Sequence, residues 1–273
     1  MTSTKKNTPK TKKDSSFVLN LTLKSTDLKK EYQKYLLEIQ KNFESKGFRK
    51  GKAPLDVVEK NISQDKVVQE ISSHLISHLY SDEIKKQKLN PIIQPKVNVL
   101  NPPLTIDKDW QIEITTCEKP ELTLDPKYKT AVKKINAQKA DKDSKDNQKL
   151  DAIFEKLASL SKVDLPDILV EADLNAHLNS VFEQLQKNNQ SFEAYLKDKN
   201  QTFEQYQEEI KKQIEKEWTL NLIIDKIAKD EKIDIKEEDV KAVINSNPQL
   251  AQNVNMVYYL LQQQNVVKYL QSL

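Results

Sequence analysis

The chain is poor in glycine, arginine and cysteine. Its 273 residues include two glycines and one cysteine, and a single arginine stands among 44 basic residues. Average usage would place about 19 glycines in a chain of this length. The lone Cys117 excludes an internal disulfide, which fits a reducing compartment. No apolar run approaches the roughly 18 residues of a membrane span, and the basic N-terminus lacks the apolar segment of a secretory signal. These absences predict a globular, cytoplasmic protein with no membrane partner.

Both glycines and the only arginine lie within five residues of one another. Glycine reaches positive φ without penalty, so two glycines are predicted to bracket a tight loop and push the residues between them outward. Arginine adds a planar fork for phosphate or carboxylate, and no acid lies between Glu44 and Asp56 to offset the cations. The alternative is a solvated turn whose phenylalanine packs into its own core. The coincidence of rare residues favours a binding loop, here called the glycine loop: Lys46, Gly47, Phe48, Arg49, Lys50, Gly51, Lys52, Ala53 and Pro54.

The net charge of +3 is unevenly distributed along the chain. Residues 1–16 carry five lysines and one aspartate, so the remaining residues sum to −1. A dedicated nucleic-acid-binding fold would normally carry a basic face. The body of this chain therefore argues against that class, and its basic features are local.

Apolar periodicity predicts two domains of different class. The first is an α+β domain, in which strands at 17–23, 96–100 and 110–116 form an antiparallel sheet with three helices, one capped by Ser25-Thr26-Asp27 and one opened by Pro54. Residues 119–135 read as an extended strap and 136–149 as a polar break. The predicted organisation is a disordered basic tail (1–16), the α+β domain (17–118), a strap and linker (119–149), and a helical domain (150–273).

The helical domain shows long amphipathic helices joined by polar breaks, which favours extended arms over one tight bundle. Arms have too few neighbours to cover every apolar stripe, and uncovered apolar patches mark protein-binding surfaces. Individually these side chains are typical helix-packing residues. Collectively they are the candidates for binding client proteins: Phe182, Tyr195, Phe203, Tyr206, Met256, Tyr258 and Tyr259.

The sequence carries few signals of enzymatic chemistry. Neither glycine fits a phosphate-cradling motif, and no local signature pairs Cys117 with a histidine. His74, His78 and Asp82 would lie along one face of a predicted helix, a spacing that could hold a metal. Both histidines border an apolar stripe, however, where a core-edge role is commoner, and no second shell is evident. We expect no catalytic residue, no metal site and no cofactor.

The glycine loop resembles a known family signature. Its residues 47–54, read Gly-Phe-Arg-Lys-Gly-Lys-Ala-Pro, are similar to the GFRxGxxP ribosome-docking motif of bacterial trigger factors, chaperones of the nascent-chain exit. The order of elements over 17–118 resembles that family's ribosome-binding domain, and 150–273 resembles its helical substrate-binding domain. The resemblance implies that the ribosome-binding residues are Lys46, Gly47, Phe48, Arg49, Lys50, Gly51, Lys52 and Pro54.

The resemblance also implies partners and one departure. The expected function is that of an ATP-independent chaperone, monomer or homodimer, which docks on ribosomal protein and RNA at the tunnel exit and shields unfolded or nascent polypeptides. Trigger factors usually insert a prolyl isomerase domain of the FK506-binding type where this chain has only the polar residues 136–149. Isomerase activity is therefore expected to be absent. The alternatives are a ribosome-independent holdase or assembly chaperone and, with less support, a residual prolyl isomerase.

Overall fold

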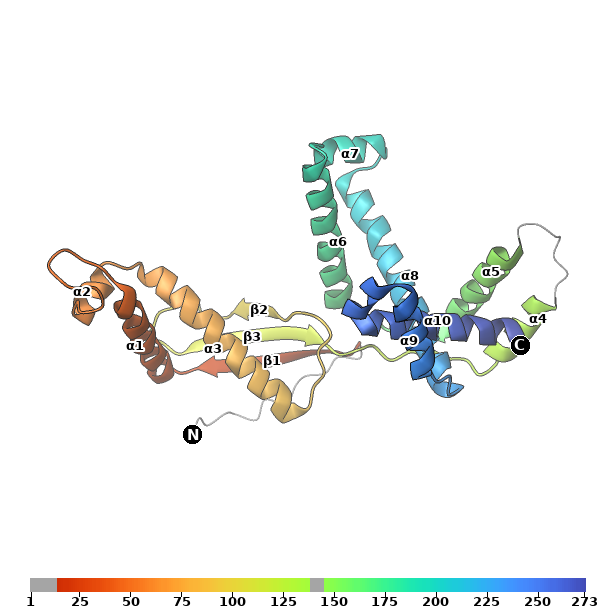
Figure 1. Cartoon of the computed structure of the whole chain (residues 1–273), viewed down its shortest axis with the longest axis horizontal. Coiled ribbons are helices and arrows are strands. Elements are labelled where there is room, and N and C mark those ends of the chain that lie inside the picture. The colour runs from red at the N-terminus through yellow and green to blue at the C-terminus, as the bar shows by residue number, and fades with distance from the viewer. Residues whose placement is uncertain (1–13, 138–144) are drawn as a thin grey trace. The chain divides into compact units, whose positions relative to one another are not determined.

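The computed structural model describes residues 14–137 and 145–273. The chain divides into two compact units, Met1–Lys119 and Pro120–Leu273 (Figure 1). The predicted basic tail falls almost wholly outside the described residues, and the first strand already begins at Ser16. No helix within the described ranges is long and apolar enough to cross a membrane.

The first unit contains a three-stranded antiparallel sheet in the order β1-β3-β2. Its strands are β1 (Ser16–Leu23), β2 (Lys96–Val99) and β3 (Trp110–Cys117). Alternate side chains of β1 and β3 face one core, where Leu19 lies opposite Ile114 and Leu21 opposite Ile112. The alternation of apolar residues along these strands determines which face is buried, because a shift by one residue would expose the whole apolar set. The predicted antiparallel sheet is confirmed.

Three helices complete the first unit: α1 (Ser25–Asn42), α2 (Leu55–Lys60) and α3 (Gln64–Gln87). The buried stripe of α1 joins the sheet core together with Val67 and Ile71 of α3. The predicted cap of α1 is wrong, because the helix starts at Ser25 and its N-cap residue, Lys24, makes no side-chain cap. The Asp109 carboxylate instead accepts a hydrogen bond from the Ser25 backbone N–H at 2.8 Å. A cap supplied from far along the chain leaves no local sequence signal.

The second unit is mostly helical, as predicted. It also contains one short antiparallel pair that the periodicity did not indicate, β4 (Thr123–Leu124) with β5 (Ser161–Lys162). The long α8 begins with a capping box in which Thr202 and Gln205 satisfy each other's backbone N–H groups. The helices are α4 (Tyr128–Asn136), α5 (Lys145–Ser159), α6 (Asp167–Lys187), α7 (Phe192–Asp198), α8 (Phe203–Asp230), α9 (Glu237–Ser246) and α10 (Val254–Ser272), with a 3-10 turn, η1 (Pro248–Asn253), before α10.

Helix α8 contributes to two separate hydrophobic cores. Its C-terminal half lies in the base core, which includes Val132 of α4, Ile153 of α5 and Val266 of α10. Its N-terminal half packs with α6 and α7 in the arm core, which includes Leu174, Leu196 and Tyr206. In Figure 1, α6 and this half of α8 form a two-helix arm whose ends α7 joins. Each helix of a two-helix arm buries only the face that contacts the other helix, so part of the apolar surface of the arm stays exposed.

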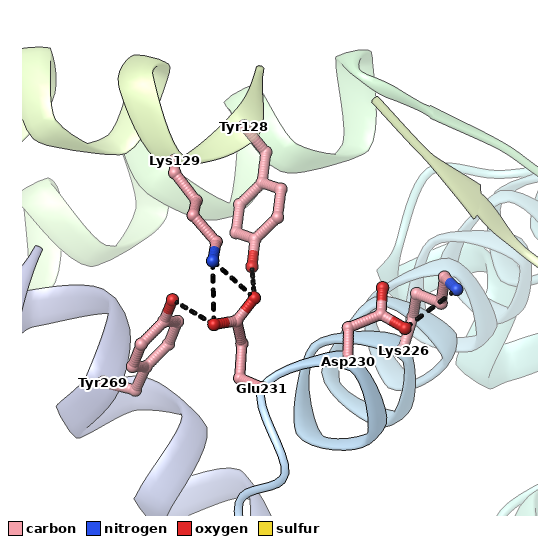
Figure 2. A network of polar contacts seen from close by, with 6 residues as sticks. All are labelled: Tyr128, Lys129, Lys226, Asp230, Glu231 and Tyr269. Atoms are coloured by element: carbon pink, nitrogen blue, oxygen red, sulfur yellow. Dashed lines mark hydrogen bonds and ion pairs between the residues drawn. The ribbon is translucent and has the colours of Figure 1, made fainter. Parts of the chain in front are cut away.

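The strap predicted at 119–135 is the main error in the fold prediction. Residues 128–136 form α4, and its Tyr128 and Val132 are buried in the base core. A carboxylate at the end of α8 also holds α4, because Glu231 accepts hydrogen bonds from the Tyr128 hydroxyl at 3.0 Å and the Lys129 ammonium at 2.8 Å. Tyr269 of α10 donates to the same carboxylate at 2.8 Å. Figure 2 shows these three donors converging on Glu231.

This network perturbs the titration of its members. The Lys129 hydrogen bond holds the pKa of Glu231 below its ordinary value, with support from Tyr269 and Tyr128. Burial, followed by the contact with Glu231, raises the pKa of Tyr128. The carboxylate is therefore charged and fully engaged at neutral pH, and it joins α4, α8 and α10 into one body.

Candidate functional site

The glycine loop consists of two consecutive turns. The Phe48 backbone N–H donates to the Ser45 carbonyl at 3.2 Å, and the Lys52 N–H donates to the Arg49 carbonyl at 2.9 Å. Each turn has a glycine in its third position, with φ of +91° at Gly47 and +74° at Gly51. The residues before these glycines do not have positive φ. This pattern is that of a type II turn, which requires positive φ at the third position.

The two glycines meet different surroundings. A Cβ at Gly47 would have nothing within 4 Å, so only its backbone conformation demands glycine. A Cβ at Gly51 would lie 2.8 Å from the Lys41 carbonyl oxygen, in the last turn of α1. The Gly51 N–H also donates to the Phe43 carbonyl at 3.1 Å. Gly51 thus fastens the loop to the end of α1, while Gly47 shapes its tip.

The base of the loop is rigid and its tip is open. Ala53 is fully buried, and its carbonyl accepts a hydrogen bond from the Gln40 side chain at 2.7 Å. Phe48, by contrast, is 43% exposed, which contradicts the alternative in which this ring packs into its own core. The other predicted ribosome-binding residues are exposed, except Gly51, which is half-buried: Lys46, Gly47, Arg49, Lys50, Lys52 and Pro54.

The loop tip carries largely uncompensated positive charge. Lys50 forms an exposed ion pair with Glu44 at 3.5 Å, which contributes little because water screens both groups. Among the described residues, no carboxylate pairs with the Arg49 guanidinium or with the ammonium groups of Lys46 and Lys52. An exposed aromatic ring next to a free guanidinium offers an apolar contact and a bidentate hydrogen-bond donor at one point.

The structure brings four predicted client-binding residues together at the end of the two-helix arm. Phe192, which was not among the predicted client-binding residues, is the centre of this aromatic cluster. Its ring centroid lies 4.6 Å from that of Phe182, 5.7 Å from Phe203, 6.0 Å from Tyr195 and 6.0 Å from Tyr206. These separations suit tilted and edge-to-face packing. Phe192 follows Ser191, whose side chain caps α7, and this start signal was the available clue to its position.

The members of this cluster differ in exposure. Phe182 and Phe203 are 44% and 38% exposed, so both rings are accessible. Tyr206 is 1% exposed, and its hydroxyl lies 2.9 Å from His177 Nε2. A buried side chain cannot contact a client, so the prediction that Tyr206 binds clients is inconsistent with this structure. The Tyr206 ring instead packs edge-to-face against Phe192 and Tyr195. Lys199 lies over the Tyr195 ring, with Nζ 5.2 Å from the centroid.

The other three predicted client-binding residues lie on α10 and make no ring contact with the aromatic cluster in the described part of the chain. Met256 and Tyr258 are 47% and 38% exposed, and they are neighbours of the exposed Val254 and Leu260. Tyr259 is half-buried, and its hydroxyl bonds with Asn221 of α8 and with Gln263. The second unit therefore presents exposed apolar side chains on the arm and on α10.

The histidines weighed as metal ligands lie on the exposed side of α3. His78 Nδ1 is 3.2 Å from an oxygen of Asp82. Over the described ranges, no group of three or more histidine, cysteine, aspartate or glutamate residues is arranged to hold a metal ion. The candidate functional surfaces in the described part of the chain are therefore the glycine loop, the aromatic cluster of the arm and the exposed apolar side chains of α10.

Comparison with known protein families agrees with this arrangement. A model described as bacterial trigger factor protein (TF) matches residues 4–153, and one described as bacterial trigger factor protein (TF) C-terminus matches residues 127–273. Each match covers more than half of the chain. The chain belongs to the trigger factor family. The glycine loop lies inside the N-terminal match and the arm inside the C-terminal match.

Individual trigger factors are similar over part of their length. The trigger factor of Bdellovibrio bacteriovorus is 34% identical over 139 residues, which is 51% of this chain and 30% of that protein. The trigger factor of Streptococcus pneumoniae strain Hungary19A-6 is 25% identical over 143 residues, 52% of this chain and 33% of that protein. The chain thus matches about a third of the length of these relatives.

One solved structure has the same fold. It comes from work on promiscuous substrate recognition in folding and assembly activities of the trigger factor chaperone. The TM-score is 0.66 at 11% identity, over 97% of this chain and 99% of that chain. The predicted fold class is confirmed by this likeness.

Proposed function

We propose that the chain is an ATP-independent, ribosome-associated chaperone of the cytoplasm. The glycine loop docks on ribosomal protein and RNA near the exit of the nascent chain, and the helical unit shields apolar segments of newly made polypeptides. The observation that carries this proposal is the geometry of the loop. Two glycine turns on a rigid base hold Phe48 and Arg49 in solvent, in a chain of the trigger factor family.

The loop has the chemistry of a small, salt-sensitive anchor. Covering the exposed part of Phe48 contributes about 1 kcal/mol, since full burial of such a ring is worth roughly 1.5–3 kcal/mol. The Arg49 guanidinium matches a phosphate or a carboxylate in a bidentate geometry. Exposed charges are screened within about 8 Å at physiological ionic strength, so docking weakens as salt rises. An apolar contact of this size and screened charge contacts are typical of reversible binding.

The arm supplies the surface for clients. The rings of Phe182 and Phe203 are exposed, yet Phe192 fixes their positions. An apolar segment that covers them gains contact area without first ordering the surface, which lowers the cost of binding. The exposed Met256 of α10 adds a flexible apolar contact of the kind found on surfaces that accept varied partners.

Absence of prolyl isomerase activity is part of the proposal. The N-terminal and C-terminal family models overlap at residues 127–153 and together span 4–273. This overlap leaves no residues between the two parts for an inserted isomerase domain, which supports the proposal. Acceleration of the proline-limited refolding of a test protein would contradict it.

Ribosome co-sedimentation tests the docking. The triple variant Phe48→Ala/Arg49→Ala/Lys50→Ala should no longer pellet with purified ribosomes. A matched control, Leu100→Ala/Lys85→Ala/Lys108→Ala, also removes one exposed apolar side chain and two exposed cations from the first unit, and it should pellet like the parent chain. Equal pelleting of both variants would refute the docking role.

A ribosome-independent holdase is the second candidate, because the aromatic cluster belongs to the unit that lacks the glycine loop. Suppression of the aggregation of a denatured test protein, measured without ribosomes, distinguishes the two. A chain that suppresses aggregation and never pellets with ribosomes would favour the holdase.

A further inference from the structure

A groove lies between α4 and α5 of the second unit. These two helices pack together in the base (Figure 1). The groove has a volume of about 560 Å³ and is here called the lysine groove. Its lining residues are Lys127, Thr130, Ala131, Lys134, Ile135 and Lys156.

Among the residues that the structure describes, the charged ones that line this groove are all cations. The ammonium groups of Lys127, Lys134 and Lys156 are exposed, and none has an ion-pair partner among the residues that the structure describes. The second unit as a whole is acidic, since 22 lysines stand against 26 aspartates and glutamates in residues 120–273. The positive field is therefore local to the groove and not a general property of the unit.

The same groove has an apolar floor. Residues 127, 130, 131, 134 and 135 follow helical spacing and share one side of α4. Ala131 and Ile135 are half-buried between the lysines, and Ile135 also packs against the base core. Free phosphate or a nucleic-acid backbone would use the cations and leave these apolar groups without a contact. A polypeptide with both carboxylates and an aliphatic side chain would use both.

The wall of the groove is held in place before any ligand arrives. The adjacent side of α4 is buried through Tyr128 and Val132, and Lys129 is engaged by Glu231 (Figure 2). Lys129 therefore does not compete for the ligand of its neighbours. The backbone of α4 is thus held in place, so binding has to order only the exposed lysine side chains.

We propose that the lysine groove binds an acidic segment of a client polypeptide, with an aliphatic side chain on Ala131 and Ile135 and flanking carboxylates on the three lysines. The inference rests on the proposed chaperone function and adds a second class of client segment. The aromatic cluster takes apolar and aromatic segments, whereas the groove takes acidic segments that the aromatic cluster does not retain.

Peptide binding by the full chain tests this assignment. The probe is a fluorescent twelve-residue peptide of alternating glutamate and serine with one central leucine, and binding is followed by fluorescence anisotropy. The variant Lys127→Gln/Lys134→Gln/Lys156→Gln should weaken binding about tenfold, since each exposed charge contact is worth several-fold at most. The control Lys133→Gln/Lys187→Gln/Lys268→Gln changes three exposed lysines of the same unit that do not line the groove, and it should stay within about twofold of the parent chain.

A second variant places a carboxylate on the floor. Ala131→Glu keeps a helix-forming residue in α4 and should abolish binding of the acidic peptide. Carbodiimide coupling of the bound peptide followed by mass spectrometry should locate amide cross-links at Lys127, Lys134 or Lys156. Equal losses in the groove and control variants, or cross-links confined to other lysines, would overturn the assignment. So would an oligonucleotide that binds the parent chain more tightly than the peptide and is lost in the groove variant.

The proposed chaperone function has a separate readout. An aromatic, uncharged peptide of the same length should bind the groove variant as it binds the parent chain, and the variant should still suppress aggregation of a test protein. Loss of both peptides and of suppression would contradict the chaperone function itself. Loss of acidic-peptide binding alone supports the groove.

Discussion

Substitution of the two glycines by alanine separates what each contributes to the loop. An alanine with positive φ costs roughly 1–2 kcal/mol, and the smaller conformational freedom of the unfolded chain returns about 0.4–1 kcal/mol. Gly47→Ala has open space around it, so its net cost should be about 1 kcal/mol or less. In Gly51→Ala the new Cβ would lie 2.8 Å from the Lys41 oxygen and 3.6 Å from the Gln40 oxygen, both of the backbone.

The α1 backbone at Lys41 cannot move aside as a flexible side chain would. Overpacking of this kind costs typically 1–3 kcal/mol, so Gly51→Ala should lower the free energy of unfolding by about 2–4 kcal/mol. Urea unfolding measures the difference through the emission of Trp110, which is 1% exposed in the core of the first unit. A Trp218→Phe background removes the signal of the second unit. Equal effects of the two substitutions would refute the claim that Gly51 fastens the loop to α1.

Three further predictions concern the second unit. Glu231→Gln should lower the melting temperature at pH 7. The folded pKa of Glu231 lies below its ordinary value of 4.5, so the stabilisation by its carboxylate is present above that value and disappears as the pH falls through the folded pKa. The melting temperatures of the variant and the parent chain should therefore converge in acid. Tyr128→Phe removes one hydrogen bond to the same carboxylate and should cost about 1 kcal/mol in urea unfolding, with near-zero cost contradicting the network. Phe192→Ala should cost about 2 kcal/mol, below the value for a fully buried ring, whereas the more exposed Phe182→Ala should chiefly reduce suppression of aggregation. The reverse ranking would show that Phe192 does not organise the aromatic cluster.

Local sequence signals predicted those parts of the fold that depend on neighbours along the chain. The alternation at residues 17–23 and the proline that precedes α2 each correspond to a feature of the structure. Helix α4 was missed because its three lysines, Lys129, Lys133 and Lys134, obscure its short apolar stripe of Tyr128 and Val132. Its contact with Glu231 joins residues about a hundred positions apart, and no window of sequence contains both partners.

The rarity of its residues located the glycine loop in the sequence, but it did not predict that both of its turns are of type II. Composition indicates that positive φ is needed, whereas the Lys41 carbonyl behind Gly51 is a tertiary contact. Tyr206 was predicted to bind clients because the helical pattern does not report burial. A tyrosine on an amphipathic helix has the same pattern whether it is exposed or buried, and only the packing of α6 and α7 against α8 decides that it is buried.

The most direct test of ribosome docking is a photocross-link from the loop tip. A benzoylphenylalanine introduced at Phe48 of the full chain, irradiated with purified ribosomes, should form cross-links to ribosomal components that high salt suppresses. The same group at Leu100, which is 48% exposed in the same unit, provides the control and should form few cross-links. Ribosomal cross-links of equal yield from both positions, or none from position 48, would contradict the account.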